Sequence, residues 1–162
     1  MQAGARVEAI AVPRGDTETI YVGIGSGNLW KTEDNGITWT PIFDDQSAFA
    51  IGDVAVSPSD PEVIWVGTGE TQPRHSGYSY AGTGVFKSAD GGKSWSHMGL
   101  TDTHHIGKVL VHPRDPDVVF VAALGHFWSR NRERGVFRTL DGGESWEQVL
   151  FLSDRTGVVD LV

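Results

Sequence analysis

The chain has 162 residues, no cysteine and a formal net charge of −8. Its acidic balance argues against nucleic acid and anionic membranes as partners, and the lack of cysteine excludes disulfides and thiolate metal ligands. No stretch approaches the roughly 18 apolar residues of a membrane span, so membrane insertion is not expected. The opening residues lack the basic and apolar regions of a signal peptide, and the compartment stays unknown.

Short β-branched and aromatic segments recur in pairs along the chain. In chain order, the pairs are 7–12 with 19–23, 51–56 with 63–67, and 106–111 with 118–121. Proline, glycine or aspartate lies between the two members of each pair, as in tight turns. Each pair therefore predicts two antiparallel strands.

An eight-residue pattern, [ST]-x-D-x-G-x-[ST]-W, follows each pair. Its three aspartates, Asp34, Asp90 and Asp141, are 56 and 51 positions apart. A third strand is expected before each pattern and a fourth after it. Units of four strands at a period near 50 residues are typical of β-propeller blades.

The predicted fold is all-β, a single propeller segment over 1–162 with three four-stranded antiparallel blades. The blades are expected at about 5–44, 49–99 and 104–151, with a partial strand of a further blade at 156–162. Because that strand is cut short, the sequence predicts a piece of a longer propeller. Each end blade would leave one face uncovered, and apolar residues line these faces. The examples are Val7, Ile10, Val12, Ile20 and Tyr21. We therefore expect a homodimer that closes a six-bladed ring.

The eight-residue pattern is predicted to be structural rather than catalytic. Its aspartate can accept backbone N–H bonds inside the turn, its glycine supplies a positive φ, and its tryptophan packs between blades. The residues assigned this role are Asp34, Gly36, Trp39, Asp90, Gly92, Trp95, Asp141, Gly143 and Trp146.

The pattern resembles the Asp box, or BNR repeat, of sialidases, xyloglucanases and sortilin-type propellers. Segments 106–116, 121–126 and 134–137 resemble bacterial sortilin (VPS10)-type BNR-repeat proteins. The resemblance implies a β-propeller and, as in sortilins, a non-catalytic scaffold that binds a peptide or glycan. Asp boxes occur in enzymes and receptors alike, so the resemblance does not decide between them. The arginine triad, tyrosine and acid of sialidases cannot be placed, so a sialidase is not implied.

Candidate functional residues come from the connections between the second and third strands. This connection is short in the first blade but runs over 69–84 and 125–134 in the others. In a propeller these loops surround the channel mouth, together with the residues before each first strand, and long loops on a rigid scaffold often carry sites. The residues aligned before the first strands are Arg6, Ala50, His105 and Arg155.

Two functions follow from this loop composition. Histidines and a glutamate could hold a divalent metal, zinc first, for hydrolysis of an ester, phosphoester or similar anionic substrate, with no organic cofactor. The catalytic candidates are Glu70, His105 and His126, and the metal ligands add His75 and His104. Substrate contacts are assigned to Arg74, Tyr78, Tyr80, Trp128 and Arg130. The alternative is a binding scaffold for a small molecule, glycan or peptide, in which the histidines only hydrogen-bond the loops.

Overall fold

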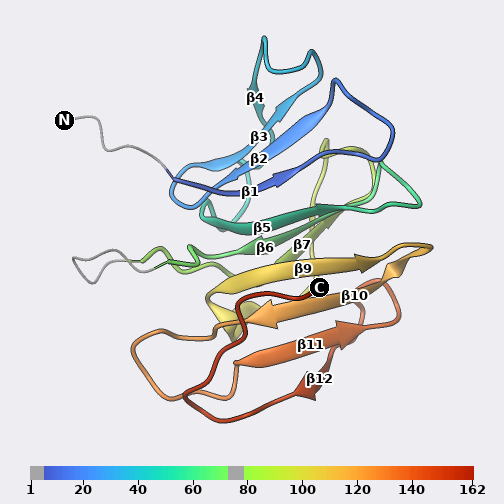
Figure 1. The fold of residues 1–162 in the computed structure, drawn as a ribbon. Helices are drawn as coiled ribbons and strands as arrows, with labels where there is room; N and C mark the ends of the chain where they lie inside the picture. The colour runs from blue at the N-terminus through green and yellow to red at the C-terminus, as the bar shows by residue number, and fades with distance from the viewer. Residues whose placement is uncertain (1–5, 73–78) are drawn as a thin grey trace, which may run out of the picture.

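The structure is a computed structural model, and it describes residues 6–72 and 79–162. It consists of three four-stranded antiparallel sheets, each with its strands in chain order, which lie one below another in Figure 1. Blade one contains β1 (Val7–Ala11), β2 (Ile20–Ile24), β3 (Asn28–Thr32) and β4 (Thr40–Pro41). Blade two contains β5 (Ile51–Val56), β6 (Ile64–Thr68), β7 (Val85–Ser88) and β8 (Ser96–His97). Blade three contains β9 (Ile106–His112), β10 (Asp115–Ala123), β11 (Gly135–Thr139) and β12 (Glu147–Leu150).

These sheets confirm the predicted all-β architecture of propeller blades. In the described residues, the only helical element is the 3-10 turn η1 (Thr101–Thr103) before β9. The first strands of neighbouring blades lie beside each other, because β5 contacts both β1 and β9. Within the described ranges, no helix has the length and hydropathy needed to cross a membrane.

Two apolar cores hold the blades together, one at each contact between neighbouring sheets. Between blades one and two, Phe43 meets Phe86 edge to face at 5.1 Å and Trp95 at the same distance. Between blades two and three, the buried Trp65 packs against Trp146. Strand residues alternate between the two faces of a blade, so the middle sheet, blade two, contributes to both cores.

The prediction that Tyr21 lines an uncovered end face is wrong. Tyr21 is only 2% exposed and belongs to the core between blades one and two. Its neighbours Ile20 and Val22 point to the opposite face, because side chains alternate along a strand. Val7, Ile10 and Val12 are exposed, as expected for the open end.

Residues 157–162 form no strand, although the sequence predicts one at 156–162. The segment lies beside β9 and β10, where the Val158 N–H donates to the Ala123 carbonyl at 3.1 Å. Val159 passes close to Gly107 on β9. The segment thus lies where a further blade would begin, without the partner strands of one.

The three eight-residue turns share one hydrogen-bond pattern. In blade two, Asp90 accepts bonds from the Ser88 hydroxyl, the Ser94 N–H and the Ser94 hydroxyl at 2.8, 2.9 and 2.6 Å. Asp34 and Asp141 accept equivalent bonds. These bonds, led by the one from the second Ser or Thr hydroxyl, lower the pKa of each aspartate to about 2. The bonds support a structural role for the turns.

Asp90→Ala is expected to lower the melting temperature by several degrees, because three donors of the turn lose their acceptor. Ligand binding at the other end of the blade should be unchanged in the folded protein. Thermal unfolding followed by circular dichroism measures the first effect, and Asp90→Asn, which keeps one acceptor oxygen, should lose less. Full stability with lost binding would show that the turn belongs to the functional site.

Candidate functional site

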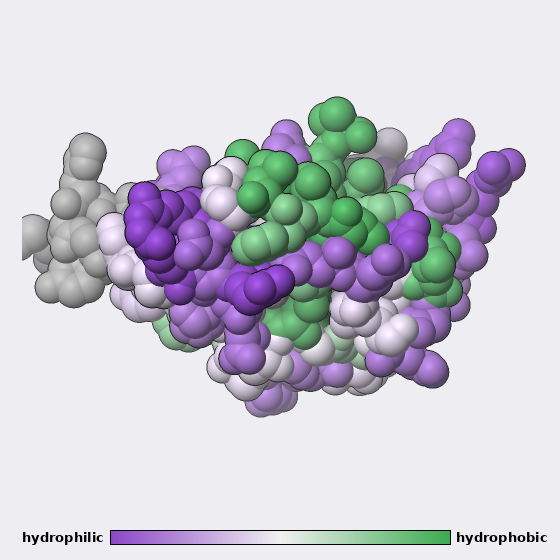
Figure 2. Space-filling view, turned by 90° about the horizontal axis from the view of Figure 1, so that it is seen from below, coloured by the Kyte–Doolittle hydropathy of each residue, from purple (hydrophilic) through white to green (hydrophobic). Residues whose placement is uncertain are grey.

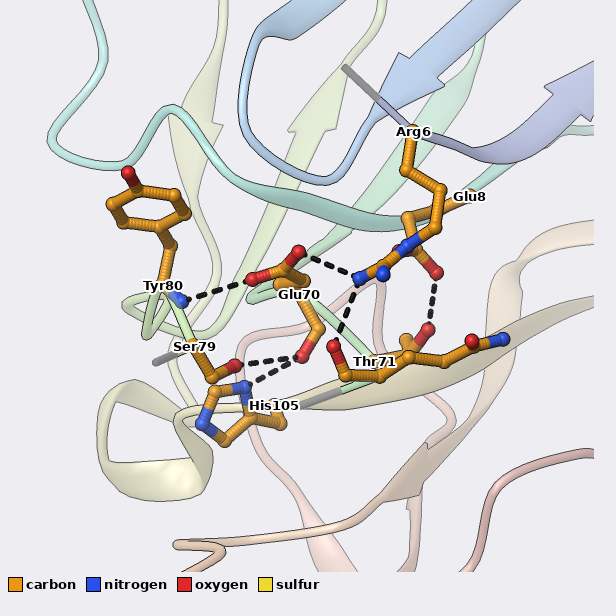
Figure 3. A network of polar contacts seen from close by, with 8 residues as sticks. Arg6, Glu8, Glu70, Thr71, Ser79, Tyr80 and His105 are labelled. Atoms are coloured by element: carbon orange, nitrogen blue, oxygen red, sulfur yellow. Dashed lines mark hydrogen bonds and ion pairs between the residues drawn. The ribbon is translucent and has the colours of Figure 1, made fainter. Parts of the chain in front are cut away.

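The connections β6–β7 and β10–β11 lie at one end of the blades, on the left of Figure 1. Glu70, at the start of the first connection, is fully buried. Its Oε1 accepts a bond from Arg6 Nη2 at 2.6 Å, and its Oε2 accepts one from the Tyr80 N–H at 3.3 Å (Figure 3). Arg6 also donates from Nε to Glu8 at 2.7 Å. Glu70 therefore links the start of blade one to the long loop of blade two.

His105 contacts the same glutamate from the other side. It is buried, and its Nδ1 donates to the Glu70 carbonyl at 2.9 Å (Figure 3). Its ring stacks on Phe127 of the β10–β11 connection, with centroids 3.9 Å apart. Burial lowers the pKa of His105 to about 4, so the imidazole is neutral near pH 7. The residue joins the loops of blades two and three.

His104 and His126 form a separate stacked pair. Their ring centroids are 3.7 Å apart and the planes differ by 11°. The His126 Nε2 donates to the Asp102 carbonyl at 2.9 Å. Burial, with a smaller contribution from His126, lowers the pKa of His104. A neutral His104 ring can therefore stack on His126 without repulsion between two like charges.

These contacts bear on the predicted metal site. In residues 6–72 and 79–162, no three or more histidine, aspartate or glutamate side chains are grouped so that they could hold a metal ion. Glu70 is paired with Arg6, and His105 and His126 each use one ring nitrogen on a carbonyl. His75, Arg74 and Tyr78 lie outside the described residues. The zinc site stays a prediction.

An open hollow of about 440 Å³ lies between the β10–β11 connection and the residues after β12. Its lining combines aromatic and cationic side chains: Phe127, Trp128, Ser129, Arg130, Arg134 and Arg155. Trp128 is 69% exposed. Arg130 lies 3.8 Å from Asp154 and is otherwise open to solvent. The hollow brings together two predicted substrate-binding residues, Trp128 and Arg130.

Arg134 supports the wall of this hollow from within. It is buried, and its guanidinium donates to the carbonyls of Leu124 at 2.8 Å, Ser129 at 3.0 Å and His126. An arginine that binds three carbonyls fixes the path of the loop, because its donors have a rigid planar arrangement. The loop thus presents Trp128 on a fixed support.

Tyr80, the third described substrate-binding candidate, lies apart from this hollow. Its ring meets Phe49 edge to face at 5.0 Å, and both rings are partly exposed. Phe49 precedes β5, so the pair joins the loops of blades one and two. Tyr80 and Trp128 are therefore two separate aromatic surfaces of the same end.

Sequence reasoning assigned no role to Arg6, Arg134 or Arg155. Arg6 and Arg155 align with His105 before the first strands. This alignment is the sequence feature that could have identified them as site residues. No signal distinguishes Arg134 from its neighbours, because three arginines lie within the five residues 130–134. Its role depends on the carbonyls that the folded loop turns toward it.

Comparison with solved structures supports the same fold. An ancestral GH74 enzyme matches with a TM-score of 0.69 and 23% identity, over 92% of this chain and 19% of its own. The GH74 xyloglucanase from Xanthomonas campestris matches with a TM-score of 0.64 and 20% identity, over 93% and 22%. YCF48 bound to D1 peptide matches with a TM-score of 0.64 and 16% identity, over 98% and 44%. No protein-family model and no curated protein matches the sequence.

These similarities show a β-propeller fold and no more, because the identities are low. The chain spans about a fifth of each GH74 enzyme and less than half of the YCF48 chain. The sortilin-type resemblance stays a prediction beside them.

Proposed function

We propose that this end of the propeller is a binding surface for a peptide or glycan segment that carries a carboxylate. The observation that carries the proposal is the hollow beside Trp128, where an exposed indole stands next to arginines. An indole face stacks on a sugar ring or an apolar side chain. A guanidinium pairs with a carboxylate through two parallel hydrogen bonds.

The polar groups around Glu70 favour binding over catalysis. A general base or metal ligand needs a free lone pair directed at the substrate. The Glu70 carboxylate is buried and bonded to Arg6 and the Tyr80 N–H, while His105 is covered by Phe127. These groups connect loops from three blades, whereas Tyr80, Trp128, Arg130 and Arg155 are exposed to solvent.

Both ligand classes have a counterpart among proteins of this fold. One similar structure is a xyloglucanase, and another is YCF48 bound to D1 peptide. The arginines of the hollow favour an acidic ligand over a neutral one, because an acidic segment would gain charge-assisted hydrogen bonds that a neutral segment would lack.

Calorimetric titration tests the proposal with two ligand sets, acidic peptides and acidic oligosaccharides, each beside a neutral analogue. We expect saturable binding of an acidic ligand, weakened about tenfold or more by Trp128→Ala, as for an aromatic anchor that the ligand covers. Arg130→Ala should weaken the acidic ligand and leave a neutral one unchanged. Leu140→Ala, an exposed apolar residue in an eight-residue turn, is the matched control and should bind as the wild type does. Equal binding by the Trp128→Ala variant would overturn the proposal.

The metal-dependent hydrolase is the competing hypothesis. It requires Glu70 to leave Arg6 and to meet His105 and His126, with His75 or His104 behind them. Elemental analysis of protein purified without chelator measures bound zinc or another divalent ion. A stoichiometric metal, together with ester or phosphoester hydrolysis that chelation abolishes, would favour the hydrolase and contradict a purely binding role.

A further inference from the structure

The open face of blade one has the composition of faces that are buried elsewhere in the chain. In blades two and three, the preceding blade covers one face of the sheet. Three residues that are cross-strand partners lie on that face, and each blade has them at equivalent positions. In blade order these positions hold Ile10, Val22 and Trp30; Val54, Val66 and Phe86; and Val109, Val121 and Phe137. All nine residues are apolar, yet Ile10 is 64% exposed. Blade one is therefore built to receive a preceding blade.

A hydrogen bond marks each internal contact between blades. Trp95 Nε1 in blade two donates to the Ile42 carbonyl of blade one at 2.7 Å, and Trp146 Nε1 in blade three donates to the Met98 carbonyl of blade two at 2.6 Å. Trp39 is the equivalent indole of blade one. It is 40% exposed and donates only to the carbonyl of Gly36 in its own turn, at 3.1 Å.

The matching acceptor lies on blade three. Ile42 and Met98 each follow the tryptophan of their own blade by three positions, and Val149 does the same in blade three. Val149 and Leu150 are exposed on β12, and Leu110 is 37% exposed on β9. Figure 2, which views the molecule from the blade-three side, shows apolar side chains gathered on this face.

A cationic side chain on the third strand of blades one and two also contacts the following blade. Lys31 of blade one reaches the Gly91 carbonyl of the next blade at 3.2 Å, and Lys87 of blade two reaches Asp117 of blade three at 2.8 Å. Arg138 holds the equivalent position in blade three. In this chain its Nη2 donates to Glu147 at 2.6 Å, and its side chain is partly exposed. Blade three therefore carries a cation at the position from which blades one and two reach the following blade.

We propose that a second copy of this chain docks head to tail, with the partner's blade three covering blade one. In this arrangement Trp39 Nε1 donates to the carbonyl of the partner's Val149, and the partner's Arg138 reaches the eight-residue turn of blade one. The two internal contacts specify the docking geometry, because the new contact repeats their donors, acceptors and apolar positions. This association is independent of ligand binding at the channel mouth.

Residues 157–162 must move for this docking. On blade two, Gly52 lies against the Ile106 carbonyl of the following first strand, and on blade three, Gly107 lies against the Val159 carbonyl. The segment thus occupies the place that β1 of a docked copy would take. A chain shortened to end at Thr156 should therefore associate more tightly than the full chain.

Light scattering on the full chain over a range of concentrations tests the proposal. We expect a mass of at least two chains, well above 17.6 kDa. Ile10→Glu alters only the blade-one side and Leu110→Glu only the blade-three side, and each variant should remain at the monomer mass. An equal mixture of the two should form a two-chain complex, because one intact contact remains between them.

The mixture also separates failed association from failed folding, since a variant that restores a complex must be folded. Phe49→Glu, an exposed apolar residue between β4 and β5 that lies on neither end face, is the matched control and should keep the wild-type mass. A wild-type monomer at high concentration, or no complex in the mixture of two variants with native circular dichroism, would overturn the proposal.

Discussion

Replacing Trp65 with alanine is expected to lower the free energy of unfolding by about 3–5 kcal/mol, the range for a large buried aromatic side chain. Trp65 is fully buried between blades two and three. Its ring meets Trp146 edge to face at 6.3 Å, and its Nε1 donates to the Pro116 carbonyl of blade three at 3.2 Å. The substitution removes apolar contacts and leaves that carbonyl without its donor.

Chemical denaturation followed by tryptophan fluorescence and circular dichroism measures the loss. Trp65→Phe should lose less, because it keeps an aromatic ring in the core. Trp128→Ala removes an exposed indole and should change stability by less than about 0.5 kcal/mol, as surface substitutions usually do. An unchanged unfolding midpoint for Trp65→Ala would mean that blades two and three are not held by this core.

Lowering the pH from 6.5 to 4 is expected to destabilise the protein through His105. Its pKa is about 4 in the folded protein and 6.5 when unperturbed, so the unfolded chain binds more protons across this window. Stability therefore falls as the pH falls. At about 1.4 kcal/mol per pKa unit, a shift from 6.5 to about 4 corresponds to about 3–4 kcal/mol, most of which is lost by pH 4.

The pH range from 6.5 to 4 distinguishes the contribution of His105 to stability from the contributions of the aspartates. Burial raises the pKa of Asp53, whose Oδ2 accepts the Val109 N–H at 2.8 Å, so protonation of Asp53 in acid favours the folded state and opposes His105. The aspartates of the eight-residue turns, with pKa values of about 2, lose their contribution below this window. The fall between pH 6.5 and 4 therefore reports on the histidines.

Urea midpoints measured from pH 7 to pH 4 test this expectation. His105→Gln removes the titrating ring and should flatten the pH dependence in this range, even if it lowers stability at pH 7. Trp128→Ala, which removes an exposed side chain and no titrating group, should retain the wild-type slope. A wild-type slope in the His105→Gln variant would assign the acid sensitivity to other groups, with His104 the first candidate because its pKa is also lowered.

The candidate site residues were only partly predictable. Unequal loop lengths indicated Glu70, His126 and Trp128, and the alignment before the first strands indicated His105. The structure places the β6–β7 and β10–β11 connections at one end of the blades, where His105 bonds to Glu70. Their partners could not be predicted, because Arg6 and Glu70 are 64 positions apart and meet only after two blades pack. The sequence suggested a shared metal for the histidines, whereas the described contacts are carbonyl bonds and ring stacking.

The sequence by itself determined the blades, because their causes are local. Strand alternation, turn residues within a few positions of each other and the repeated eight-residue pattern set each four-stranded sheet. Only the tertiary structure decided which face of a blade is covered, as Tyr21 shows by pointing into the first core rather than to the open end. It also decided the protonation of His105, because burial between two loops, and not the residue type, lowers its pKa.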